Sequence, residues 1–202
     1  MNTGDARNAD LCAVILAGGQ SRRMGRNKAL IQVESSPLIA RVAEQALRLT
    51  NQVFVSSNDA GVYDFLGLPA LPDLYPGQGP LAGLHAAFKN TDRPLVLLLA
   101  CDLPALHDVM LRRLLELCQG HDAVIPRTTD GRLHPLCGIY RRTCLNTIEH
   151  NVRRGINKMT DLFRDGSLRV KFVDGRDGRF DDSNLRNLNT PEDLEAYTHR
   201  HS

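Results

Sequence analysis

Short apolar runs alternate with amphipathic segments along most of the 202-residue chain. The run at 94–100, "PLVLLLA", is continuously apolar, which is typical of a central parallel strand covered on both faces. Three further runs predict strands at 12–17, 52–57 and 122–127. Segments with helical spacing lie between them. This alternation predicts an α/β fold of three layers, with a mostly parallel central sheet and helices on both faces.

The helical pattern is clearest in three segments. In 35–50 the apolar residues recur at helical spacing, and we expect Ser36 as the N-cap with Pro37 at the first helical position. The segments 79–90 and 106–120 predict two more helices on the same grounds.

The pattern is looser in the C-terminal third of the chain. Strands are expected around 134–140 and 168–174. Helices are expected at 142–153 and 156–166, and a capped helix at 190–200 ends the pattern.

No repeat, linker or low-complexity stretch interrupts these elements. We therefore expect one domain over residues 11–198, preceded by a flexible tail at 1–10. With 42% hydrophobic and 24% charged residues, the composition is that of a globular protein. The net charge of +2 argues against a general nucleic-acid binder, and no run reaches the roughly 18 apolar residues of a membrane helix. We expect neither nucleic acid nor a membrane as a partner.

The chain has five cysteines, an odd number without CxxC spacing. This usage argues against a disulfide framework and against a zinc site. It predicts free thiols and a cytoplasmic location, because the cytoplasm is reducing.

The first predicted strand runs into an unusual stretch, "LAGGQSRRMGRNKAL". Its paired glycines let the backbone approach a ligand closely, and successive N–H groups can cradle a phosphate or contact a base. Four cationic residues follow within seven positions, with no acid among them: Arg22, Arg23, Arg26 and Lys28. The spacing matches neither the Walker A loop nor the dinucleotide GxGxxG motif. The composition favours anion binding over a solvated turn.

Asp102 follows the continuously apolar run almost directly, in "LLLACDLP". A carboxylate at a strand end is well placed to bind Mg²⁺, which takes one or two carboxylates and otherwise keeps water and phosphate ligands. A turn or capping role is the alternative for this residue. The cationic stretch at another strand end favours the metal.

Weaker candidates lie in three other stretches. In "PDLYPGQGPLAGL", Asp73 lies in a loop and Gly79 opens a helix whose N-terminus can favour a phosphate or a base carbonyl. Asn187 and Asn189 precede the last predicted helix and can present amides to a polar ligand. His134 stands in "HPL". Taken alone, a turn with a helix start explains the first of these stretches about equally well. Asparagines before a helix cap are more often turn formers, and a lone histidine more often makes a structural hydrogen bond.

Together these stretches resemble the nucleotidyltransferase family, which has a Rossmann-like fold, and within it the molybdenum cofactor guanylyltransferases of the MobA type. "LAGGQSRRMGRNKAL" resembles the family signature LAGGxSxRMGxxKxL. "GPLAG" matches a second family stretch, "CDLP" resembles the metal-binding CDxP motif, and "NLNTPEDL" resembles the C-terminal NxNTPEDL. The matches run from Leu16 to Leu194 in the order that the family has, which covers most of the chain.

The resemblance implies that the protein transfers GMP from GTP to the terminal phosphate of molybdopterin and releases pyrophosphate, with Mg²⁺ as cofactor. It also implies transient contact with proteins that hand over the cofactor. The implied nucleotide contacts are Leu16, Ala17, Gly18, Gly19, Lys28, Asn58 (with Ser56 as the other candidate at that strand end), Asp73, Gly79 and Asp102. The implied catalytic residues are Lys28, Arg23 and Asp102, of which Asp102 binds the metal. The pterin side is implied to hold His134, Asn187 and Asn189.

Three other functions stay open at this point. The first two are a cytidylyltransferase that acts on the same pterin and another nucleotidyltransferase for a small phosphate. The third is a nucleotide-binding adaptor without catalysis, which predicts the loss of Lys28 or Asp102, although both are present. The choice of GTP over CTP rests on the resemblance.

Overall fold

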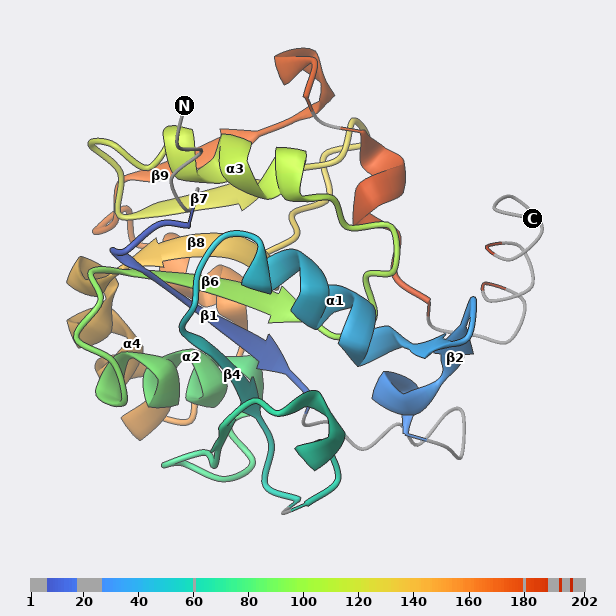
Figure 1. The fold of residues 1–202 in the computed structure, drawn as a ribbon. Helices are drawn as coiled ribbons and strands as arrows, with labels where there is room; N and C mark the ends of the chain where they lie inside the picture. The colour runs from blue at the N-terminus through green and yellow to red at the C-terminus, as the bar shows by residue number, and fades with distance from the viewer. Residues whose placement is uncertain are drawn as a thin grey trace.

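The computed structural model describes residues 7–17, 27–59, 61–179 and 181–188, together with Asp193 and Tyr197. Within these residues a seven-stranded sheet runs through the centre, in the order β5-β4-β1-β6-β8-β7-β9 (Figure 1). Its strands are β1 (Leu11–Leu16), β4 (Val53–Ser56), β5 (Ala70–Leu71), β6 (Leu95–Ala100), β7 (Ala123–Pro126), β8 (Cys137–Arg141) and β9 (Val170–Val173). Only β8 runs antiparallel to its neighbours among these strands, so the predicted mostly parallel sheet is confirmed.

Helices cover both faces of the sheet (Figure 1). They are α1 (Leu38–Leu47), α2 (Gly79–Lys89), α3 (Asp108–Glu116) and α4 (Leu145–Arg153). Side chains alternate between the two faces of a strand. Accordingly Leu11, Ala13 and Ile15 of β1 pack in one core cluster with α1 and α3, whereas Cys12 and Val14 pack with α2 and α4 in the other. The predicted three-layer α/β architecture is therefore confirmed.

The predicted N-cap at Ser36 is wrong. Ser36–Pro37 forms strand β3, which pairs antiparallel with β2 (Gln32–Val33), and α1 starts at Leu38 without a side-chain cap. The reason is the hairpin turn, in which Glu34 and Ser35 both have positive φ, 49° and 70°. A two-residue turn of this kind brings the flanking residues into a ladder, so Ser36 is used as a strand residue.

Other boundaries differ by a few residues. The helix predicted at 106–120 ends at Glu116, and the segment 156–166 holds only a 3₁₀ helix, Met159–Phe163. The strand expected around 134–140 starts at Cys137, because the chain before it turns. The helix predicted at 142–153 begins as a 3₁₀ turn before α4. Most of the predicted tail at 1–10 and of the predicted helix at 190–200 lies outside the described residues.

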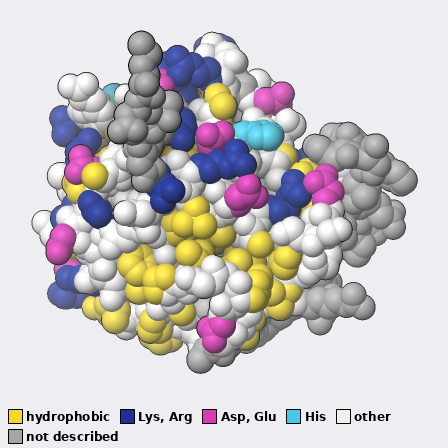
Figure 2. Space-filling model, in the orientation of Figure 1, with side chains coloured by type: hydrophobic (Ala, Val, Ile, Leu, Met, Phe, Trp, Pro, Cys, Tyr) yellow, Lys and Arg dark blue, Asp and Glu magenta, His cyan; other side chains and the backbone are white. Residues whose placement is uncertain are grey.

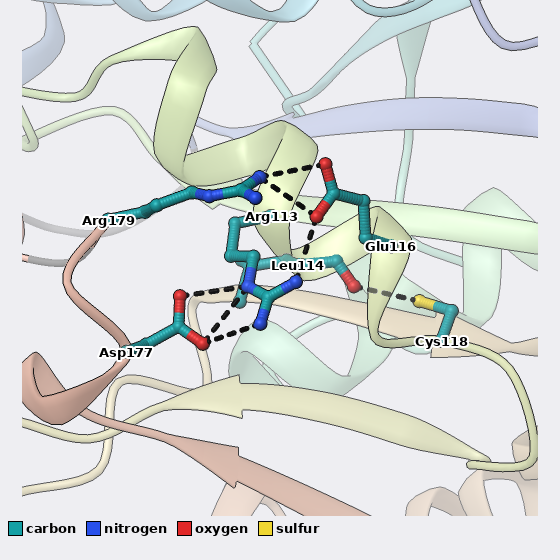
Figure 3. Close-up of polar contacts among 6 residues, drawn as sticks. All are labelled: Arg113, Leu114, Glu116, Cys118, Asp177 and Arg179. Carbon is teal, nitrogen blue, oxygen red and sulfur yellow. Dashed lines mark hydrogen bonds and ion pairs between the residues drawn. The ribbon is translucent and has the colours of Figure 1, made fainter.

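After β9 the described chain returns across the carboxyl edge of the sheet as residues 174–179 and 181–188, here called the C-terminal return. Salt bridges to α3 hold its first part, as Figure 3 shows. Arg113 Nε lies 2.8 Å from Asp177 Oδ1, and its Nη2 lies 2.8 Å from Oδ2. Arg179 in turn donates to Glu116 at 3.0 Å. The return is therefore fastened to the helix layer before it reaches the end of β6.

The surface carries mixed charge. On the face shown in Figure 2, basic and acidic side chains are interspersed around a central apolar area. No helix in the described part of the chain is long and apolar enough to cross a membrane.

Candidate active site

A cavity of about 670 Å³ opens at the carboxyl ends of the neighbouring strands β4, β1 and β6. Ligands of open α/β sheets bind at this edge, beyond the ends of the parallel strands. The described residues that line it are Leu16, Ala17, Asn27, Lys28, Ala29, Ser56, Asn58, Asp73, Gly77, Gly79, Pro80, Ala100, Cys101, Asp102, Leu136 and Asn187. Most of the residues that the resemblance assigns to a nucleotide thus share one cavity.

Lys28 is held at the cavity by a short 3₁₀ helix, Lys28–Leu30. Asn27 caps this helix, since its Oδ1 accepts from the peptide N–H of Ala29 at 3.1 Å. Strand β1 ends at Leu16, and the N–H of Ala17 donates to the Ser56 carbonyl at 3.0 Å. This last bond keeps the ends of β1 and β4 in register.

Asp73 and Asn58 form a reciprocal pair at the end of β4. Asn58 Nδ2 donates to Asp73 Oδ2 at 3.2 Å, and the Asp73 peptide N–H donates to Asn58 Oδ1 at 3.0 Å. Ser56 Oγ lies 3.4 Å from the other carboxylate oxygen. Both candidates for this strand end, Ser56 and Asn58, therefore contact the same carboxylate.

Asp102 follows β6, and the C-terminal return meets it there. Asn187 Nδ2 donates to Asp102 Oδ1 at 2.9 Å, and the peptide N–H of Leu188 donates to the Asp102 carbonyl at 3.0 Å. The sequence assigns Asn187 to the pterin side. In the structure its amide contacts the carboxylate that is expected to bind the metal.

Gly79 opens α2 at the cavity wall, with a φ of +62° that only glycine adopts without strain. The residue after it is proline, which suits the first turn of a helix. The N-terminus of an 11-residue helix, with its partial positive charge, therefore borders the cavity.

His134 is not among the residues that line this cavity. Its peptide N–H donates to the Pro126 carbonyl at 2.9 Å, and its own carbonyl accepts from Cys137 at 3.0 Å. The ring is half-buried, and burial lowers the pKa of the imidazole. Its main-chain bonds fix the turn before β8.

Gly18, Gly19, Arg23 and Asn189 lie outside the described residues. Sequence reasoning missed other cavity residues, among them Asn27, Cys101 and Leu136. Asn27 had a signal, because asparagine is a preferred cap directly before a helix. Cys101 is a neutral thiol, since burial raises its pKa to about 12.

The carboxylates among the residues that line the cavity are Asp73 and Asp102. In the part of the chain that the structure describes, no group of three His, Cys, Asp or Glu side chains could hold a metal ion. This donor set does not suit zinc, which needs several nitrogen or sulfur ligands. It suits a hard cation that needs one or two carboxylates and shares a phosphate ligand.

The family model of the MobA-like NTP transferase domain matches residues 13–170. The chain is 33% identical over 188 residues to the probable molybdenum cofactor guanylyltransferase of Clostridium perfringens, with 91% of this chain and 93% of that protein covered. A protein of the same name from Pelotomaculum thermopropionicum is 36% identical over 191 residues, with 90% and 88% covered.

Solved structures agree with these relatives. The molybdopterin-guanine dinucleotide biosynthesis protein A of Archaeoglobus fulgidus has a TM-score of 0.78 and 26% identity, with 94% of this chain and 97% of that chain covered. The 4-diphosphocytidyl-2C-methyl-D-erythritol synthase of Anaerococcus prevotii has a TM-score of 0.73 over 95% of both chains, and at 14% identity it shows the fold alone. The family model and the sequence relatives together show that the chain belongs to the MobA-like NTP transferase family and is a nucleotidyltransferase, as its motifs predict.

Proposed function

We propose that the protein transfers GMP from GTP to the terminal phosphate of molybdopterin and releases pyrophosphate. The observation that carries this proposal is that Lys28 and Asp102 line the same cavity, which opens at the carboxyl ends of the neighbouring parallel strands β1 and β6. A cationic side chain can bind a triphosphate, and a carboxylate that lines the same cavity can bind the metal ion that accompanies it.

The chemistry requires alignment and neutralisation of charge more than covalent help from the protein. A phosphate oxygen of the acceptor attacks the α-phosphorus of the nucleotide in line, and the bond to the bridging oxygen of pyrophosphate breaks. The attacking phosphate is already an anion at neutral pH, so no general base is required. Lys28 neutralises charge on the phosphates and on the pyrophosphate that leaves.

Mg²⁺ is the cofactor that the donor set of the cavity supports. Asp102 would hold it, and the bond from Asn187 orients one of the two carboxylate oxygens. The ion would neutralise phosphate charge. Leu16, Ala17, Asn58 and Asp73 are the proposed contacts of the nucleoside, because they line the part of the cavity at the ends of β1, β4 and β5.

The relatives supply the argument for guanine and for the pterin acceptor. Proteins named as probable molybdenum cofactor guanylyltransferases align over about nine-tenths of the chain, at 33% and 36% identity. A cytidylyltransferase remains the second candidate, because the fold is shared with enzymes that bear cytidylyl names. A non-catalytic adaptor is disfavoured, since both Lys28 and Asp102 line the cavity.

Calorimetric titration with Mg²⁺ and each of GTP, CTP, ATP and UTP tests the donor. We expect clear preference for GTP, followed by pyrophosphate release when molybdopterin is added. Preference for CTP would move the protein to cytidylyl transfer with the same mechanism. GTP binding without release of pyrophosphate in the presence of molybdopterin would favour the adaptor.

A further inference from the structure

In the sequence Tyr63 lies between β4 and β5, and only 5% of its surface is exposed. Its ring belongs to the core cluster that also contains Ala29, so the packing fixes the orientation of the phenol. The mechanism proposed above gives this side chain no role. Its hydroxyl nevertheless contacts two residues that line the cavity, Ala17 and Asn27.

Three hydrogen bonds pass through these residues in one direction. The peptide N–H of Ala29 donates to Asn27 Oδ1 at 3.1 Å, and Asn27 Nδ2 donates to the Tyr63 hydroxyl at 2.9 Å. The hydroxyl then donates its own proton to the Ala17 carbonyl at 3.1 Å. Each of these three donors has an acceptor, and successive hydrogen bonds of this kind polarise one another.

The consequence is a fixed spacing between two residues that line the cavity, Ala17 and Asn27. Ala17 directly follows the last residue of β1, and Asn27 is the N-cap of the short helix that holds Lys28. A single phenolic oxygen is bonded to both. The contacts join positions 46 and 36 residues apart in the sequence, so neither is a product of local chain geometry.

We propose that Tyr63 is a positioning residue that sets the distance between Lys28 and the end of β1 in the nucleoside triphosphate site. This inference rests on the proposed function, in which Lys28 meets the phosphates and Leu16 and Ala17 meet the nucleoside. Phosphate and nucleoside belong to one ligand of limited reach, so the spacing of their two subsites affects how well both are bound at once.

The test replaces the hydroxyl and keeps the ring. Tyr63→Phe is compared with Tyr140→Phe, because Tyr140 is also buried and also donates to a carbonyl, that of Pro135, at 2.6 Å. We expect Tyr63→Phe to raise the Kd of GTP with Mg²⁺ about tenfold, which corresponds to about 1.4 kcal/mol. We expect Tyr140→Phe to lower the melting temperature without changing that Kd.

Asn27→Ser provides a second variant that does not depend on the stability of Tyr63→Phe. Serine keeps the helix cap but cannot reach and donate to the phenol. We expect Asn27→Ser to raise the Kd as well, and the double variant with Tyr63→Phe to bind no more weakly than the weaker single variant. Independent effects would instead multiply.

Two results would overturn the proposal: a Kd for Tyr63→Phe within about twofold of the wild type, or an equal loss in Tyr140→Phe. Preference of the wild type for another nucleotide contradicts the proposed function only, and the same comparison made with that nucleotide then tests Tyr63. A wild-type protein that binds no nucleoside triphosphate would contradict both.

Discussion

At the scale of single residues, asparagines support two of the charged residues that line the cavity. Asn27 caps the turn that carries Lys28, and Asn187 donates to Asp102. A carboxylate that is already oriented loses less side-chain freedom when a cation binds than one that is free to rotate. The neutral amides do this without adding charge that would compete with a phosphate or a metal.

The first prediction concerns Asp102→Asn. The amide keeps the size of the side chain but removes the negative charge, so we expect turnover with Mg²⁺ and GTP to fall by at least about 10²-fold. The melting temperature should change little, because the main-chain bond from Leu188 to residue 102 remains. Pyrophosphate release measures the activity. Turnover equal to that of the wild type would remove Asp102 from the mechanism.

The second prediction concerns Lys28→Ala. Removal of the ammonium group leaves phosphate charge without a partner, so we expect kcat/KM for GTP to fall by about 10². Lys171→Ala is the matched control, because Lys171 is exposed on β9 at the far edge of the sheet. An equal loss in both variants would show a general effect of surface charge instead of a role for Lys28.

The sequence identifies Asp102 because it follows a strong apolar run almost directly, and Lys28 because it stands in a cationic, glycine-containing stretch after the first strand. Tyr63 is different, because its role depends on contacts 36 and 46 residues away that no local pattern records. Asn187 lies between these cases. Its position before a predicted helix is visible in the sequence, whereas its contact with Asp102 depends on how the C-terminal return crosses the sheet.

At the scale of elements, the strands with long apolar runs are predicted and the shortest ones are missed. β6 has six consecutive buried residues, which makes it unmistakable. β2, β3 and β5 have two residues each, too few to show a period of two. The pairing of β2 with β3 depends on a hairpin turn, and β5 pairs with its neighbour β4.

Strand β8 lies between β6 and β7 and allows close packing at one glycine. A Cβ at Gly138 would lie 2.7 Å from Ile125 Cδ1 and 3.1 Å from the Val124 carbonyl. Because the second contact is main chain of the paired strand, it cannot relax by a rotamer change. We expect Gly138→Val to lower the free energy of unfolding by about 1–3 kcal/mol, measured by urea denaturation. An unchanged free energy of unfolding would mean that β7 and β8 can move apart at Gly138 without loss of stability.

At the scale of the whole molecule, ionisable groups connect elements that lie far apart in the sequence. His85 of α2 is almost fully buried and lies 3.4 Å from Glu149 of α4, with Lys89, Arg153 and Tyr75 around the pair. Burial lowers the pKa of His85. On the other face, salt bridges to Arg113 and Arg179 connect the C-terminal return to α3 (Figure 3).

These shifts give stability a defined dependence on pH. The pKa of Asp177 is lowered by hydrogen bonds from Arg113, and that of Asp122 by a hydrogen bond from Thr143. Acids with a lowered pKa stabilise the folded state above about pH 4, and this contribution is lost as pH falls further. The lowered pKa of His85 acts in the same direction but in a higher window, below about pH 6.5, because the unfolded chain binds its proton first.

We therefore expect the free energy of unfolding to be level from about pH 7 to 8 and to fall in two steps as the pH is lowered. The first step, which begins below about pH 6.5, belongs to histidines with a lowered pKa, so His85→Gln should reduce it while the second step, near pH 4 and below, persists. His150→Gln is the matched control, since that residue is exposed on α4. Urea denaturation at intervals of half a pH unit measures both steps. A first step of the same size in His85→Gln and in the wild type would show that the buried contact between α2 and α4 does not set it.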